Sequence, residues 1–231
     1  MISKDKILVI IPARGGSKGI LGKNFKKLGG KPLIEYTIDL ARQLFDDSAI
    51  CISTDDLQII QIAEHLGLKV PFIRPTELAT DTSNTYDALL HAINFYEQKD
   101  FYYDVVLLLQ PTSPFRLPKH IEEALALYSP DIDMVVSVKE SHAASVLCNE
   151  NTNGYLNFVL NTKGIRRQEM TTYYEYNGSI YVINIQSLKE KDISKFNKKI
   201  KYVMSAEYSI DIDTPFDWNF AEYILKTKTH V

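Results

Sequence analysis

The fold is decided by a segment near the amino end, ILVIIPARGGSKG, which occupies residues 7–19. Residues 7–11 are all apolar, and continuous runs of this kind are typical of strands covered on both faces, as in parallel sheets. Pro12 ends the run, and a polar, glycine-rich loop continues to about Asn24. Because ligands of open α/β sheets bind beyond the carboxyl ends of the strands, this loop lies where a ligand is expected.

Strand and helix patterns alternate along the rest of the chain. Apolar residues recur at helical spacing in segments that begin near Pro32, Thr54, Thr85, Pro118 and Thr214. The strands expected between and beside these helices lie at residues 50–53, 69–73, 105–109, 134–138, 179–184 and 200–204. This order predicts a single domain, residues 1–231, with the α/β architecture of a doubly wound, mostly parallel, Rossmann-like sheet.

The regular pattern weakens between Lys139 and Tyr176, where Asn, Thr, Tyr and charged residues are frequent. The dipeptide Asn153-Gly154 is typical of a tight turn between two strands. A plain loop of this length is unusual inside a domain. Residues 139–176 are therefore expected to form a small β excursion or to make an oligomer contact.

Composition and charge narrow the classes of function. The net charge of -3 is unsuited to a protein that coats nucleic acid, which needs a basic face. Cys51 and Cys148 form neither a disulfide framework nor a zinc site, which favours a reducing compartment. The amino end lacks the pattern of a signal peptide, and no apolar segment approaches the roughly 20 residues that cross a bilayer. We therefore expect a cytoplasmic protein with neither a nucleic-acid nor a membrane partner.

The glycine-rich loop carries three cations, Arg14, Lys18 and Lys23, among glycines that let the backbone approach an anion closely. This combination suits a triphosphate. The spacing matches neither the P-loop nor the dinucleotide-binding fingerprint. Taken alone, the loop is equally compatible with a solvated basic turn.

Two further polar segments follow expected strands. In QPTSPFR, residues 110–116, the amide of Gln110 at a strand tip suits a polyol or a carboxylate; the alternative is a rigid turn with Arg116 on the surface. In SIDIDTP, residues 209–215, Asp211 and Asp213 alternate and so face the same side of an extended chain, as a shared Mg²⁺ requires. Asp213 or Thr214 alternatively caps the following helix, but Asp211 lies too far upstream for a cap.

Five blocks, in order along nearly the whole chain, resemble the acylneuraminate cytidylyltransferase (CMP-sialic acid synthetase) family. They are IPARGGSKG (11–19) with GKN (22–24) and GKPLI (30–34), RPTELATDTS (74–83), LLQPTSPFR (108–116), NGSIY (177–181) and DID (211–213). The resemblance implies a nucleotidyltransferase fold and a reaction that joins CMP from CTP to a nine-carbon acidic sugar, with Mg²⁺ as cofactor and diphosphate as the second product. It also implies a homodimer, with residues 139–176 as the dimerisation excursion.

The resemblance also implies roles for single residues. One set would hold CTP: Arg14, Gly16, Ser17, Lys18, Lys23, Asn24, Arg74, Ser83 and Thr85. Gln110 would contact the acidic sugar, and Arg167 would reach its carboxylate. Asp211 and Asp213 would bind Mg²⁺. Arg14, Lys18 and Asp211 would act in catalysis by offsetting the charge that grows on the departing diphosphate.

Two departures from the family pattern lie on the sugar side. Members that use N-acetylneuraminate often carry a lysine in the segment occupied here by HAASV, residues 142–146, and an arginine just before the Asn-Gly motif, where this chain has Glu175-Tyr176. N-acetylneuraminate and legionaminic-type sugars therefore both stay open as acceptors. The alternative functions are nucleotidyl transfer with another nucleotide or sugar, and nucleotide-sugar binding without catalysis.

Overall fold

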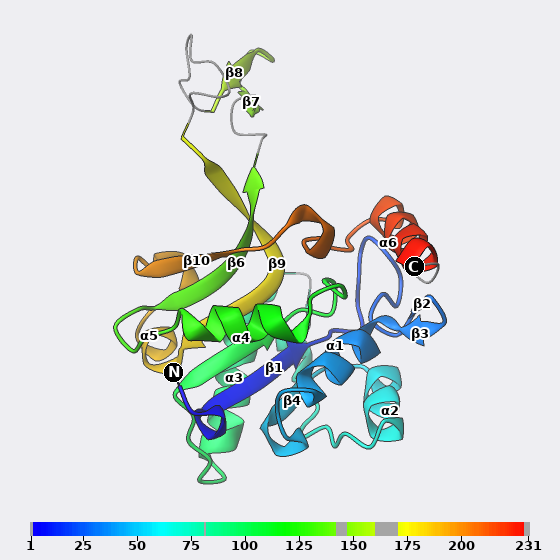
Figure 1. The fold of residues 1–231 in the computed structure, drawn as a ribbon, viewed down its shortest axis with the longest axis vertical. Coiled ribbons are helices and arrows are strands. Elements are labelled where there is room, and N and C mark those ends of the chain that lie inside the picture. Colours follow the sequence, from blue (N-terminus) through cyan, green and yellow to red (C-terminus); the bar gives the residue numbers. More distant parts are fainter. Residues whose placement is uncertain (1, 81, 142–146, 160–170, 229–231) are drawn as a thin grey trace.

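A six-stranded sheet lies at the centre of the computed structural model, which describes residues 2–80, 82–141, 147–159 and 171–228 (Figure 1). Its strands are β1 (Ile7–Pro12), β4 (Ile50–Ser53), β5 (Val105–Leu109), β6 (Met134–Ser141), β9 (Tyr173–Asn184) and β10 (Lys199–Val203), in the order β10-β6-β9-β5-β1-β4. β1 pairs in parallel with β4 and β5, and β6 pairs in parallel with β10. β9 is antiparallel to both of its neighbours. The predicted mostly parallel sheet is confirmed.

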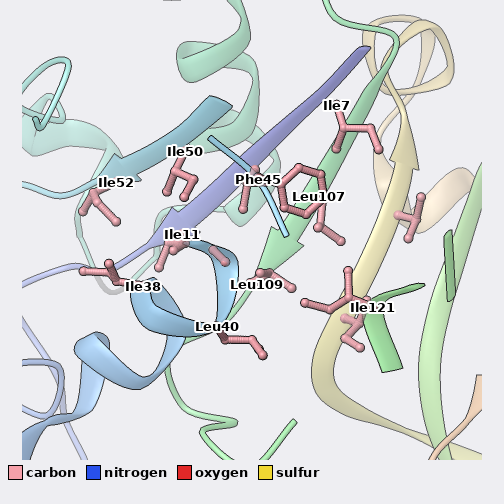
Figure 2. Close-up of a cluster of buried hydrophobic side chains, with 14 of the residues drawn as sticks. Ile7, Ile11, Ile38, Leu40, Phe45, Ile50, Ile52, Leu107, Leu109 and Ile121 are labelled. Carbon is pink, nitrogen blue, oxygen red and sulfur yellow. The ribbon is translucent and has the colours of Figure 1, made fainter. Parts of the chain in front are cut away.

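Helices cover both faces of this sheet. One face carries α1 (Leu33–Arg42), α2 (Leu57–His65) and α4 (Pro118–Ala126), and the other carries α3 (Thr85–Glu97) and α5 (Ile185–Glu190). Ile7, Val9 and Ile11 of β1 pack into the first layer, and Leu8 and Ile10 into the second, because successive strand side chains point to opposite faces. Figure 2 shows part of the first layer. The run of apolar residues in β1 thus reflects burial on both sides.

A third cluster joins the two ends of the chain. α6 (Pro215–Lys228) packs beside the small hairpin of β2 (Lys27–Leu28) and β3 (Lys31–Pro32). Leu28 from the hairpin and Trp218 from α6 are both buried in this cluster. In the part of the chain that the structure describes, none of the helices is long and apolar enough to cross a membrane.

Two expected strands differ from those in the structure. Residues 69–73 make only a single bridge, between Thr54 and Ile73. Pro71 has no N–H to donate to a ladder, so pairing beside the edge strand β4 does not extend. The strand expected at 179–184 is longer, because β9 begins at Tyr173. Its antiparallel direction also could not be predicted from the spacing of apolar residues.

β6 and β9 continue beyond the sheet as a two-stranded arm, paired as far as Ser141 and Tyr173. Farther along the chain, β7 (Cys148–Glu150) and β8 (Leu156–Phe158) form a short hairpin, which Figure 1 shows well away from the main body. Leu156 and Phe158 on this hairpin are exposed. Residues 139–176 thus include β structure, whereas their role as a dimer contact stays a prediction.

Asp133 ties the start of β10 to the start of β6. Its side chain is 6% exposed, accepts hydrogen bonds from the N–H groups of Asn197 and Lys198 at 3.0 and 2.9 Å, and pairs with Lys191. Burial alone raises the pKa of this carboxyl, but these donors outweigh it and hold the pKa well below the ordinary value of 3.8. A lowered folded-state pKa stabilises the fold above pH 3.8, and this contribution is lost as the pH falls below that value.

Asp133→Asn is therefore expected to lower the free energy of unfolding at pH 7 by about 1.5–3 kcal/mol, as for hydrogen bonds to a charged group. The gap between the variant and the parent protein should narrow below pH 3.8, since the parent then loses the same contribution. Urea unfolding at a series of pH values measures it. A gap that stays constant down to pH 2 would contradict this assignment.

Candidate active site

A cavity of about 330 Å³ opens at the carboxyl ends of β1 and β5. All but two of the site residues predicted from the sequence line this cavity. Those that do are Arg14, Gly16, Ser17, Lys23, Asn24, Arg74, Ser83, Thr85, Gln110, Asp211 and Asp213. Lys18 is exposed on the same glycine-rich loop and is not part of the lining. Arg167 lies outside the described residues. The structure therefore brings the cationic loop and the two aspartates to one crevice, although almost 200 residues separate them.

The glycine-rich loop is held by contacts that only small residues permit. Gly15 donates its N–H to Asp55 at 3.0 Å, and a Cβ at Gly15 would lie 2.4 Å from an oxygen of Asp56. The Asn24 amide donates to the carbonyl of Arg14 at 3.0 Å. Asn24 thus shapes the loop in this structure, and the backbone of the loop is left close to the cavity.

The segment with the two aspartates is clamped between two loops. Ile212, which is fully buried, donates its N–H to the carbonyl of Thr112 at 2.9 Å. Lys23 donates to the Ile212 carbonyl and to Asp213 Oδ1, each at 2.8 Å. Because Ile212 points into the protein, Asp211 and Asp213 on either side of it both face the cavity.

Thr214, rather than either aspartate, caps the last helix. Its hydroxyl accepts a hydrogen bond from the N–H of Asp217 at 3.3 Å, and Asp217 accepts in return from the N–H of Thr214. The carboxylate of Asp213 is engaged with Lys23 instead. The alternative in which Thr214 caps the helix is confirmed, and it leaves both aspartates available to the crevice.

Asp211 is the more buried of the two carboxylates. Burial raises its pKa, the Thr112 hydroxyl lowers it, and the charge of Asp213 raises it. Asp211 Oδ1 and Thr112 Oγ1 are nonetheless buried without a partner of good hydrogen-bond geometry. An unbonded carboxylate oxygen beside a second carboxylate is the donor set that a hard divalent cation takes.

A cation here would need ligands from outside the protein. Within the described ranges, no group of three or more His, Cys, Asp or Glu side chains is placed to hold a metal ion. Mg²⁺ is commonly bound through one or two carboxylates, with water and substrate phosphates completing its shell. Asp211 and Asp213 fit this pattern, so the residues present suit Mg²⁺ together with a nucleotide.

Two arginines beneath the crevice are buried. Arg74 donates to the hydroxyl and the carbonyl of Ser53, and burial lowers its pKa while the nearby Asp55 raises it. Arg116 is 3% exposed, so the alternative that placed it on the surface is wrong. The side chain turns inward because the carbonyls of Gln110 and Ser179 accept its hydrogen bonds. The sequence offered no signal for this beyond its place in LLQPTSPFR.

Replacement of Lys23 tests the clamp on the aspartate segment. Lys23→Met leaves the buried Ile212 carbonyl without a donor, so the free energy of unfolding should fall by about 1–3 kcal/mol. Asp213→Asn is the matched control, because the Asp213 side chain is 69% exposed and water can replace Lys23 there. Its cost should stay below about 1 kcal/mol. Equal losses in both variants, measured by urea unfolding, would mean that the Ile212 contact carries no weight.

Comparisons with known proteins place the chain among cytidylyltransferases. The sequence model of the family described as cytidylyltransferase matches residues 8–229. The chain is 38% identical over 229 residues to the CMP-N,N'-diacetyllegionaminic acid synthase of Legionella pneumophila, covering 96% of this chain and 97% of that protein. It is 32% identical to a pseudaminic acid cytidylyltransferase of Campylobacter jejuni, with 96% and 97% covered.

Longer relatives and solved structures extend the comparison. The N-acylneuraminate cytidylyltransferase of Streptococcus agalactiae serotype V is 38% identical over 219 residues, or 92% of this chain, and the match spans only 52% of that protein. The solved structure of a CMP:2-keto-3-deoxy-manno-octonic acid synthetase complexed with CTP superposes with a TM-score of 0.74. It covers 96% of this chain and 99% of that one at 19% identity, which supports the fold alone.

Proposed function

The chain belongs to the cytidylyltransferase family, and on that premise we propose that it transfers CMP from CTP to a nonulosonic acid with release of diphosphate. Relatives that match over nearly their whole length are named for this chemistry, with legionaminic and pseudaminic acids as acceptors. The observation that carries the proposal is the single crevice shared by Arg14, Asn24, Asp211 and Asp213.

The reaction forms one bond and breaks another at the α-phosphorus of CTP. The anomeric hydroxyl oxygen of the sugar bonds to that phosphorus, the bond to the diphosphate oxygen breaks, and the hydroxyl proton is released. Negative charge grows on the departing diphosphate. Mg²⁺ held by Asp211 and Asp213 would offset part of this charge when bound. Arg14, and Lys18 from the exposed part of the same loop, would supply fixed positive charge to the phosphates.

The remaining lining residues divide between nucleotide and sugar. Arg74, Ser83 and Thr85 line the cavity and would contact the nucleoside. Gln110, which follows β5, would contact the sugar, as would Arg167.

We also propose that the protein acts in the cytoplasm, and as a homodimer whose contact includes the exposed Leu156 and Phe158 of the hairpin. Light scattering of the parent protein and of a Leu156→Ser, Phe158→Ser variant tests the dimer.

A matrix of nucleotides and acceptors tests the function. CTP, UTP, dTTP and GTP are each incubated with N-acetylneuraminic, legionaminic and pseudaminic acids in the presence of Mg²⁺. Diphosphate release and product mass are measured. CTP with one of the acids should yield a CMP-sugar, and omission of either sugar or Mg²⁺ should abolish release. Activity with a nucleotide other than CTP, or nucleotide binding with no product for any acid, would sink the proposal.

A further inference from the structure

Arg116 is a buried cation, and none of the carboxylates among the described residues accepts a hydrogen bond from it. Its guanidinium donates instead to the carbonyl of Ser179 at 2.8 Å, the carbonyl of Gln110 at 2.7 Å and the hydroxyl of Thr37 at 2.6 Å. Burying a charged side chain costs several kcal/mol unless other groups compensate for it. A residue of this kind, directly beneath a crevice, needs an explanation beyond packing.

Two of the three partners of Arg116 are carbonyls of the backbone segments that flank Asp211. Ser179 follows Gly178, where an added Cβ would lie 2.7 Å from Asp211 Oδ2. Gln110 begins the loop in which the Thr112 carbonyl accepts the N–H of Ile212, the neighbour of Asp211. Arg116 therefore joins the carboxyl end of β5 to the Asn177-Gly178 bend of β9, and the Asp211 carboxylate sits between them.

The bend in β9 lets the backbone at Gly178 approach the Asp211 carboxylate closely. The pairing of β9 with β6 shifts register between Val136 and Val138, and Gly178 adopts a φ of 70°, which favours glycine. Asn177 is buried and bonds to the hydroxyls of Ser137 and Ser209. This network fixes the bend from below, so that the bare Cα of Gly178 faces the Asp211 carboxylate.

We propose that Arg116 is a positioning residue, which holds the Gln110 and Ser179 backbones at the separation that orients the Asp211 carboxylate for a cation. Asp211 also raises the pKa of Arg116, against the lowering caused by burial, which fits two opposite charges facing each other without direct contact. The inference rests on the proposed function, since it concerns the same cation site. It adds a residue outside the cavity lining that fixes the position of the Asp211 carboxylate.

The test measures cation binding without turnover. Mn²⁺ is a hard, paramagnetic substitute for Mg²⁺, and its binding to the protein with CTP but no sugar is followed by electron paramagnetic resonance. Arg116→Lys keeps the charge but cannot reach three partners with a planar fork. We expect it to fold, as judged by a cooperative thermal transition, and to bind Mn²⁺ about 10–100-fold more weakly, as when other groups that orient metal ligands are removed. With substrates, kcat should fall more than the KM for CTP rises.

Two controls separate positioning from stability. Thr37→Val removes one hydrogen bond of Arg116 on the side of α1, and Ser179→Ala removes a hydroxyl that has no partner while keeping the carbonyl that Arg116 uses. Both should bind Mn²⁺ as the parent does, whatever their melting temperatures. Gly178→Ala approaches the same carboxylate from the other side and should weaken Mn²⁺ binding.

The outcomes decide the inference. Unchanged Mn²⁺ affinity in a folded Arg116→Lys protein overturns it, and so does an equal loss of affinity in Thr37→Val. Failure of both Arg116→Lys and Gly178→Ala to fold also overturns it, because these residues would then determine stability. Turnover by the parent protein tests the proposed function separately. A parent that turns over CTP and sugar but binds no Mn²⁺ would keep the function and end this inference.

Discussion

Asp211→Asn should reduce kcat by about 10²–10³-fold, the range found when one group that stabilises transition-state charge is removed. The substitution keeps the shape of the side chain and removes its charge. Asp211 lines the crevice, and among the described residues its buried Oδ1 has no hydrogen-bond partner. The lost charge should therefore weaken the binding of the cation at this carboxylate. The Mg²⁺ concentration needed for half-maximal rate should rise in the variant, which a merely destabilised protein would not show.

Asp39→Asn is the matched control for Asp211. It also removes one negative charge, but Asp39 lies on α1, outside the cavity lining, in a partly exposed ion pair with Lys31 of β3. Its kcat should equal that of the parent, because partly exposed pairs contribute little. Steady-state diphosphate release at saturating CTP and sugar measures both variants. A folded Asp211→Asn protein with parental kcat and parental Mg²⁺ dependence would remove Asp211 from the site.

Gly19→Ala should lower both activity and stability, because Gly19 is where the glycine-rich loop touches the aspartate segment. An added Cβ would lie 2.0 Å from the backbone carbonyl oxygen of Asp213, which no side-chain rotation can relieve. Overpacking of this kind costs about 1–3 kcal/mol. A forced shift of about 1 Å between catalytic groups can cost about 10²-fold in rate. Thermal unfolding and diphosphate release measure the two effects.

Gly16→Ala provides the comparison for stability. Gly16 is on the same loop, but no atom lies within 4 Å of a Cβ built there. Its melting temperature should therefore match that of the parent. If Gly19→Ala melts like Gly16→Ala, the close packing of the loop against Asp213 is not a feature of the protein in solution.

Local pattern was enough to predict the elements that form the site. The apolar runs of β1 and β5 are buried on both faces, as their composition indicated, and each is followed by the polar loop expected to bind a ligand. The prediction failed at residues 69–73, where Pro71 outweighs the surrounding apolar residues. It failed again at Arg116, whose burial depends on the Ser179 carbonyl and the Thr37 hydroxyl, which are far away in the sequence.

The amino-acid sequence by itself determined the α/β class, the family, and the two segments that meet at the crevice, which are the glycine-rich loop and the segment with Asp211 and Asp213. Side-chain periodicity and motif residues are local properties, so they can be recognised without the fold. Only the tertiary structure decided that Lys23 clamps Ile212 and Asp213, that β9 runs antiparallel with a bend at Gly178, and that Arg116 is buried. These contacts join residues as much as 190 positions apart. They arise when buried backbone groups of packed elements find their hydrogen-bond partners, and no local pattern in the chain encodes that pairing.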